Sequence, residues 1–229
     1  MNAQADADPQ TLRISMDTKT TVAIGEYSRY GRSRGLEPVK ALDHDMQPKE
    51  KLVPGGILEP VSGRSFLFFT DSCKTSDFMA DGLMLWWQER KQDNPEVKRL
   101  VINIDNGPEC SGRRSQFLQR MVEFADTTGL EVRLAYYPPY HSKYNAIERY
   151  WAGLEKSWNG YLPNTVSSVL KRAGNFFWKG LRATVKMIDV VYEKGVKVCG
   201  KEKVKLEQRL NRSDRLPLYD ITIKPKMVN

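Results

Sequence analysis

The sequence predicts an α/β fold in which a mixed five-stranded sheet carries helices on its faces and a basic extension follows. Segments alternate as three strands, helix, strand, helix, strand, helix, which is typical of an α/β architecture. The 229 residues are 40% hydrophobic, enough for one core with an appendage rather than two full domains. Lys and Arg outnumber Asp and Glu only at the end, by 15 to 6 over residues 165–229 against 21 to 22 before them.

The first part of the chain predicts a three-stranded antiparallel unit. We expect a disordered start over residues 1–11, because it is polar. Residues 12–24, LRISMDTKTTVAI, begin with apolar and polar residues in alternation and predict a strand or hairpin, with Asp17 pointing away from the apolar side. Residues 25–55 lack periodicity and predict a long loop. Strands near 55–61 and 64–70, joined by a Ser-Gly turn, complete the unit.

The next segments predict helices that alternate with buried strands. Residues 76–92 place Phe78, Leu83 and Trp86 on one stripe, which predicts a helix. The segment 99–105 predicts a buried strand that ends at Asp105, and residues 111–128 predict a helix ended by Gly129. A strand at 130–137 and a helix over 145–158 follow. The predicted boundaries are a core over 12–160 and a basic, partly helical extension over 161–229.

Composition excludes several classes of protein. The three cysteines form no CxxC pair, so they predict reduced thiols rather than disulfides or a zinc site. The polar, acidic start is not a signal peptide, and the longest apolar runs are too short to span a bilayer. We therefore expect a cytoplasmic protein without membrane contact.

The basic end of the chain suits a polyanion. Residues 165–229 carry a net charge of +9, and nucleic acid is the commonest polyanion in a cytoplasm. A solvated basic tail explains the charge equally well. Charge alone does not decide between these interpretations.

Three carboxylates lie at positions in this order of elements where active-site residues are often found. Asp17 lies in the first strand, Asp105 at the carboxyl end of the fourth, and Glu148 in the first turn of the helix after the fifth. Active sites of open α/β sheets gather at the carboxyl ends of parallel strands. Converging carboxylates repel one another unless a cation lies among them, and oxygen ligands favour magnesium or manganese. Two such ions can activate a nucleophile against a phosphodiester.

Each acid also has a local explanation. Glu148 follows Asn145 by three residues, which is the spacing of a capping box. Asp105 in Asp-Asn-Gly could only form a turn, and Asp17 could be a solvent-facing strand residue. Chance seldom places three acids at these three points of one topology, so the combination favours a metal site.

Long motifs carry a resemblance to a known family. INIDNGPE (102–109) and YYPPYHSKYNAIERYW (136–151) resemble the catalytic core of bacterial insertion-sequence transposases of the DDE type, most closely the ISAzo-type group, distant relatives of the mariner elements. RISMD (13–17), KALDHD (40–45) and KTSDF (74–78) resemble that group too, so the similarity spans roughly residues 12–200. The resemblance implies an RNase H-like fold.

The resemblance also implies the chemistry. Asp17, Asp105 and Glu148 match the family's three acidic positions, which implies that they hold two divalent ions, Mg or Mn. Water then attacks DNA first, and a 3′-hydroxyl attacks target DNA afterwards. Partners are expected to be element ends and target DNA, with a homodimer assembled on DNA in the bacterial cytoplasm, associated with the nucleoid. Further DNA contacts are expected from a set of polar residues near these acids: Asn106, Arg113, Arg114, His141 and Lys143.

One departure concerns the start of the chain. Such transposases carry an N-terminal helix-turn-helix region that reads the element ends, whereas only 11 residues precede the first predicted strand. We therefore expect an N-terminally truncated catalytic domain. Two alternatives stay open: a catalytically inactive remnant that binds DNA nonspecifically, and an RNase H-like nuclease without strand transfer.

Overall fold

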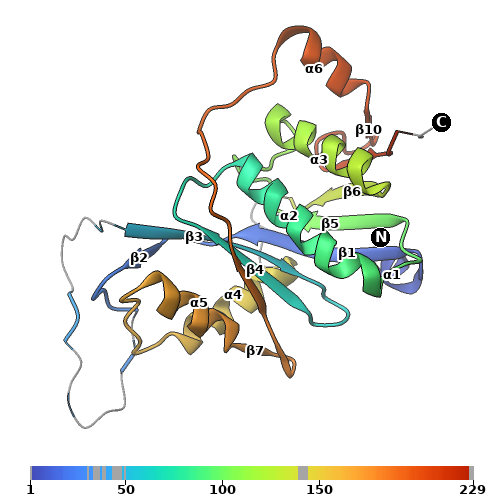
Figure 1. Ribbon diagram of the computed structural model, residues 1–229. Coiled ribbons are helices and arrows are strands. Elements are labelled where there is room, and N and C mark those ends of the chain that lie inside the picture. The colour runs from blue at the N-terminus through green and yellow to red at the C-terminus, as the bar shows by residue number, and fades with distance from the viewer. Residues whose placement is uncertain are drawn as a thin grey trace.

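The predicted strand segments form the middle of one large sheet. The computed structural model describes residues 2–29, 31–32, 37, 40–42, 48, 50–138 and 144–226. The strands of the predicted core are β1 (Thr11–Thr18), β2 (Val22–Ile24), β3 (Glu50–Leu58), β4 (Ser65–Thr70), β5 (Arg99–Ile104) and β6 (Glu131–Tyr136). Five of them lie in the order β4-β3-β1-β5-β6, while β2 pairs with β3 (Figure 1).

Strand direction brings several strand ends to one edge. β1 runs antiparallel to β3 and parallel to β5, and β5 runs parallel to β6. β3 and β4 form a hairpin whose turn contains Gly63, at a φ of 78° that favours glycine. The carboxyl ends of β1, β5 and β6 therefore lie side by side.

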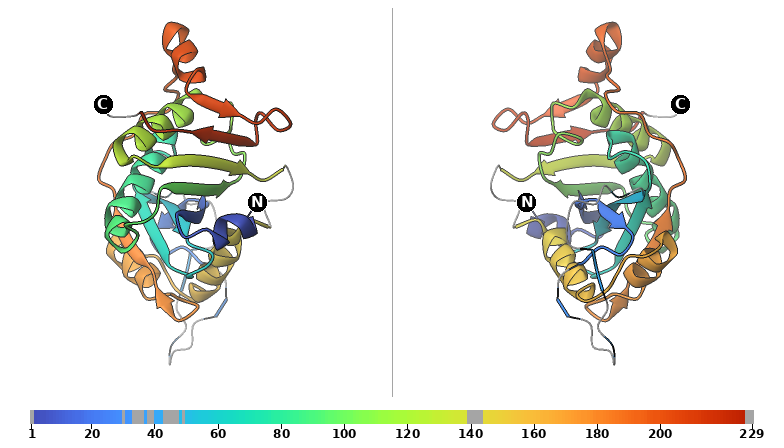
Figure 2. Two further views of the ribbon diagram at one scale, coloured as in Figure 1. Left: turned by 90° about the vertical axis from the view of Figure 1, so that its right-hand side faces the viewer. Right: turned by 90° about the vertical axis from the view of Figure 1, so that its left-hand side faces the viewer.

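Helices cover both faces of this sheet. α2 (Ser76–Arg90) and α3 (Ser115–Thr128) pack on the face to which Ile14 and Met16 of β1 point. α4 (Ala146–Ser157) and α5 (Val166–Gly174) pack on the other face. Figure 2 shows α2 and α3 on one side of the sheet and α4 on the other. This arrangement confirms the predicted α/β fold with flanking helices.

The start of the chain differs from the disordered segment that we expected. Residues Asn2–Ala7 form α1, and Ala5 packs on Val101 of β5 and Ala135 of β6. Arg13 Nε lies 2.6 Å from a carboxylate oxygen of Asp6 in α1. This small apolar contact and this ion pair attach α1 to the sheet, although its composition is polar.

The extension after residue 161 adds strands as well as helices. It contains β7 (Phe177–Trp178), β8 (Leu181–Arg182), β9 (Thr184–Met187), α6 (Gly200–Glu207), β10 (Leu210–Arg212) and β11 (Asp220–Ile223). β9 runs parallel to β4 at one edge, and β11 runs antiparallel to β6 at the other. Within the described residues the sheet therefore has nine strands rather than the predicted five.

A strap, residues 188–199, joins the two ends of this extended sheet. It leads from β9 past the N-terminal end of α2 to α6 (Figure 1). Ile188, Tyr192 and Val198 are buried in the core formed with α2 and α3. The Tyr192 hydroxyl donates to Asp81 at 2.8 Å. The extension is therefore packed on the core along its length.

Some strands and helices begin at other residues than the sequence predicts. β3 begins at Glu50, inside the loop predicted over 25–55, and α3 begins at Ser115 rather than at residue 111. Most of the remaining loop lies outside the described residues. In the part of the chain that the structure describes, every helix is too short or too polar to cross a membrane.

Candidate active site

Asp17 lies near the carboxyl end of β1, on the face that α4 covers. Alternation along the strand turns Ile14 and Met16 to one core and Ser15 and Asp17 to the other side. Asp17 pairs with Gly56 of β3 across the sheet. The carboxylate accepts a hydrogen bond from Trp151 Nε1 at 3.1 Å. A carboxylate predicted to face away from the apolar side thus lies under a helix, fixed by an indole.

Gly56 is what leaves room for that indole. A Cβ placed on Gly56 would lie 2.6 Å from Trp151 Cη2 and 3.1 Å from Ile147 Cδ1. No side chain fits there unless the Trp151 indole shifts. A glycine inside a strand often marks such a close approach, so the Gly55-Gly56 pair signals in the sequence that another segment approaches this strand, but it does not identify that segment.

Asp105 is the first residue after β5. Because β1 and β5 are adjacent and parallel, Asp105 follows the strand next to the one that carries Asp17. The loop after it is closed by local contacts: Asn106 Oδ1 accepts from Gly112 N at 3.2 Å, and the Cys110 thiol lies 3.4 Å from the Asp105 carbonyl oxygen. Burial raises the pKa of the Cys110 thiol, and the negative charge of Asp105 adds to that rise.

Glu148 is held in the first turn of α4, and the capping box expected for it does not form. Asn145 is the N-cap residue but makes no side-chain capping bond. Instead the Ser15 hydroxyl of β1 accepts from Ile147 N at 2.9 Å and donates to Asn145 Oδ1. A strand residue therefore caps this helix, and Glu148 is left free of a capping role.

Electrostatics connects the three acids. Burial raises the pKa of Asp17 to about 7, and the negative charges of Asp105 and then Glu148 contribute to that rise. Burial, followed by the charge of Asp105, raises the pKa of Glu148, while Lys19 opposes it. Three carboxylates from three separate segments thus act on one another at one edge of the sheet.

The pKa of Asp105 is raised like those of Asp17 and Glu148, and the positive charge of Lys74 lies close enough to oppose the rise. Burial is the main cause of its raised pKa, Lys74 opposes the rise, and Glu109 adds to it. Glu109 and Lys74 form an ion pair at 3.5 Å. Lys19 and Lys74 are therefore the cations that partly offset the acids. Sequence reasoning assigned no role to either, because Lys19 lies outside the motifs and Lys74, which begins KTSDF, is brought to Asp105 only by the fold.

The donor set fits a hard divalent cation. The acids offer only oxygen ligands, which magnesium and manganese prefer, and their raised pKa values show that added positive charge would stabilise them. Among the described residues, no three acidic, histidine or cysteine side chains are already grouped closely enough to enclose an ion. An ion would have to draw the carboxylates together.

The other predicted contact residues are scattered. Arg113 is exposed, and Arg114 is the N-cap residue of α3, whose guanidinium donates to Val196 O in the strap at 3.2 Å. Asn106 shapes its own loop, as described above. His141 and Lys143 lie outside the described residues.

The chain is related in sequence to a known family. A sequence model of the family described as Rhodopirellula transposase DDE domain matches residues 1–225. No curated protein matches the chain in a sequence search.

Solved structures add a likeness of fold. The chain is similar to the "Crystal structure of the Mos1 mariner paired end complex with Mn", with 13% identity, a TM-score of 0.50, and coverage of 74% of this chain and 48% of that one. It is also similar to the "Mos1 transposase paired-end complex with left transposon end", with 10% identity, a TM-score of 0.51 and the same coverage. The chain thus spans about half the length of these proteins. At such identities the likeness shows a shared fold, and it confirms the RNase H-like expectation.

Proposed function

Because the chain belongs to the Rhodopirellula transposase DDE domain family, we propose that it performs metal-dependent DNA cleavage and strand transfer for an insertion sequence. In this proposal Asp17, Asp105 and Glu148 are the catalytic, metal-binding residues. The observation that carries it is the placement of these three acids: Asp17 near the carboxyl end of β1, Asp105 directly after the adjacent parallel β5, and Glu148 in the first turn of α4. Trp151 of the same helix binds the Asp17 carboxylate.

Two divalent ions, Mg or Mn, would be held by these carboxylates and would supply Lewis-acid activation of a water or 3′-hydroxyl at the phosphodiester. The complexes to which the chain is similar are described as containing manganese and a paired transposon end, which supports this choice of ion and substrate. Trp151 orients the Asp17 carboxylate, and the cap from Ser15 fixes the helix turn that presents Glu148. These contacts would fix the segments that carry two of the three ligands.

DNA is the proposed partner, both as element ends and as target. The net charge of +9 over residues 165–229 supports this, because phosphate neutralisation dominates DNA affinity. We further propose that two copies act together on DNA, one for each of two paired ends such as those that the similar complexes are named for.

Nicking of a supercoiled plasmid in Mn²⁺ tests the reaction without requiring a particular end sequence. Glu148→Gln should lose nicking by at least ~100-fold, since a neutral amide is a poor ligand for a hard cation. Glu96→Gln, which removes an exposed carboxylate elsewhere, should nick like the parent. Equal nicking by Glu148→Gln and the parent would overturn the assignment.

The same assay separates the two alternatives. A labelled duplex with a free 3′-hydroxyl end is added as a donor. If the plasmid is nicked but the labelled end is never joined to it, the chain is a nuclease without strand transfer. If DNA binds but neither parent nor variants nick it, the chain is an inactive DNA-binding remnant. Joined products that disappear in Asp105→Asn would support the full proposal.

A further inference from the structure

A surface pocket with three cations lies between the strap and the start of α2. It has a volume of about 350 Å³, and its lining includes Lys74, Arg114 and Lys194 with one acid, Glu109. The cations come from three separate segments: the residue before the N-cap of α2, the N-cap of α3, and the strap. We call this the strap pocket.

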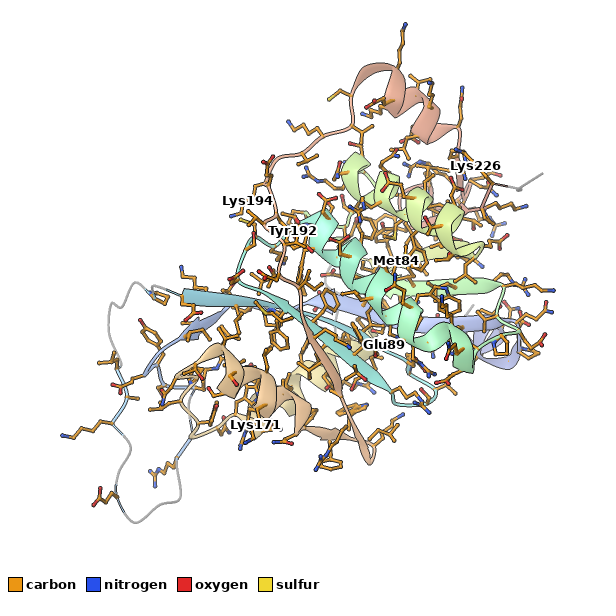
Figure 3. All side chains as sticks on the ribbon, viewed as in Figure 1. Met84, Glu89, Lys171, Tyr192, Lys194 and Lys226 are labelled. Atoms are coloured by element: carbon orange, nitrogen blue, oxygen red, sulfur yellow. The ribbon has the colours of Figure 1, made fainter. Side chains whose placement is uncertain are left out.

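The strap holds Lys194 in place. Two residues earlier, Tyr192 packs edge-on against Phe78 at 5.7 Å between ring centroids, and its backbone N donates to Ser72 Oγ at 2.8 Å. Two residues later, Val196 O accepts from Arg114. Figure 3 shows Lys194 beside Tyr192, next to the N-terminal end of α2. Within the described residues Lys194 is exposed and has no ion-pair partner.

The strap pocket borders the loop that carries Asp105. A Cβ placed on Gly107 would lie 3.6 Å from Asp105 Oδ1 and 3.9 Å from Glu109 Oε2, so both carboxylates lie close to one point. Lys74, the partner of Glu109, also acts on the Asp105 carboxylate. An anion in the pocket would therefore sit near the candidate active site.

We propose that the strap pocket binds a backbone phosphate of DNA, close to the phosphodiester that the three acids act on. The inference rests on the proposed function for its choice of ligand. Lys74, Arg114 and Lys194 outnumber the single Glu109, and side chains of Arg and Lys are the usual phosphate contacts. In this arrangement the C-terminal extension, through Lys194, helps to set the register of DNA against a site built from the core.

Binding of a fluorescein-labelled duplex, followed by anisotropy in EDTA over a series of salt concentrations, tests the proposal without catalysis. Lys194→Gln should weaken binding by roughly 3- to 10-fold and make the slope of log K against log salt shallower by about one, as for one lost phosphate contact. Lys98→Gln removes an exposed lysine at the opposite end of β5 and should change affinity less than about twofold. Unfolding curves check that both variants keep the fold.

A charge change of opposite sign gives a second arm. Glu109→Gln removes the acid of the strap pocket and should tighten binding of the duplex. The proposal is overturned if Lys194→Gln binds DNA like Lys98→Gln, or if Glu109→Gln binds no tighter than the parent.

Two further measurements distinguish DNA from free phosphate as the ligand, and failure of the pocket claim from failure of the proposed function. If calorimetry shows that Lys194→Gln loses inorganic phosphate while its DNA affinity stays at the parental value, the pocket is a free-anion site and the DNA claim fails. If the parent never nicks DNA but Lys194→Gln still weakens binding, the proposed function fails and the strap pocket stands. If nicking occurs and Lys194→Gln binds normally, only the pocket claim fails.

Discussion

Ser15 links the strand that carries Asp17 to the helix that carries Glu148. Its buried hydroxyl is the acceptor for Ile147 N and the donor to Asn145 Oδ1. No other described side chain caps α4, since Asn145 makes no capping bond. The distance between two proposed metal ligands therefore depends on one hydroxyl.

Ser15→Ala should destabilise the protein by about 1–2 kcal/mol, because it leaves a buried helix N–H without its acceptor. Urea unfolding measures the loss. Ser157→Ala serves as the control: its hydroxyl donates only to Leu154 O within the same helix, so its removal should cost less than about 0.5 kcal/mol. Equal unfolding midpoints for Ser15→Ala and the parent would show that the cap carries no weight.

Asp17 makes stability depend on pH in the absence of metal. Its pKa is raised to about 7 in the folded protein, above the unfolded value near 3.9, so the unfolded chain binds fewer protons between these values. The contribution of Asp17 to the free energy of unfolding should be fully present below about pH 4 and should be lost as pH rises toward 7. The upper bound of the loss is about 4 kcal/mol, at roughly 1.4 kcal/mol per pKa unit.

Asp17→Asn should remove this loss. In EDTA the variant should be more stable than the parent at pH 8, with the gap closing toward pH 4, as read from urea unfolding at both pH values. A parent that is as stable as the variant at pH 8 would mean that Asp17 ionises without cost in the folded protein.

At the scale of elements, α4 approaches the sheet at a glycine. Gly56 lies opposite Asp17, and its missing side chain lets Trp151 reach the carboxylate. α4 was predictable as a helix from its apolar spacing, and β1 from its alternation. Their close approach was not, because it depends on which residues of two distant segments face each other.

Gly56→Ala should push α4 from β3 and destabilise the protein by roughly 1–3 kcal/mol, as overpacking does. Gly174→Ala is the matched control, since a Cβ there meets only Val185 Cγ2 at an ordinary 3.6 Å. It should be neutral or stabilise α5 by up to about 1 kcal/mol. Thermal unfolding of the two variants compares them, and equal melting temperatures would contradict the close packing.

At the scale of the whole molecule, the predicted α/β fold was confirmed, whereas the strands that the extension adds to the sheet were not predicted. The order of strands and helices before residue 158 followed from periodicity and from turn residues such as Gly129. β9 and β11 are short, and β11 has only the sequence DITI, so local pattern gave no reason to join them to the sheet. Edge pairing with β4 and β6 is a long-range property that spacing does not show.

Deleting residues 165–229 should therefore lower the free energy of unfolding more than the deletion of an unstructured tail would. Loss of β11 uncovers the edge of β6, and loss of the strap removes Ile188, Tyr192 and Val198 from the core. We expect the full chain to unfold in one cooperative transition and the shortened chain to unfold at lower urea with a broader one. A shortened chain with the parental midpoint would show that the extension is an independent appendage.

The three acids could be selected as candidates from the sequence, because each lies in a motif and at a characteristic point of the predicted topology. The groups that position and offset them were not. Ser15 and Lys74 lie in the motifs RISMD and KTSDF and Lys19 lies outside any motif, but their contacts cross from β1 to α4 or from one loop to another, which no motif shows. Sequence patterns locate a candidate site, whereas its supporting contacts depend on the folded geometry.

The central claim is that Asp17, Asp105 and Glu148 form one site for divalent ions. Calorimetric titration of the chain with Mn²⁺ tests it most directly, with Asp105→Asn and Glu148→Gln beside the parent and Glu96→Gln as the control. We predict that the parent and the control bind Mn²⁺ and that both site variants bind at least ~10-fold more weakly, since loss even of an outer-shell partner costs that much. Mn²⁺ binding of equal strength in all four proteins would contradict the claim.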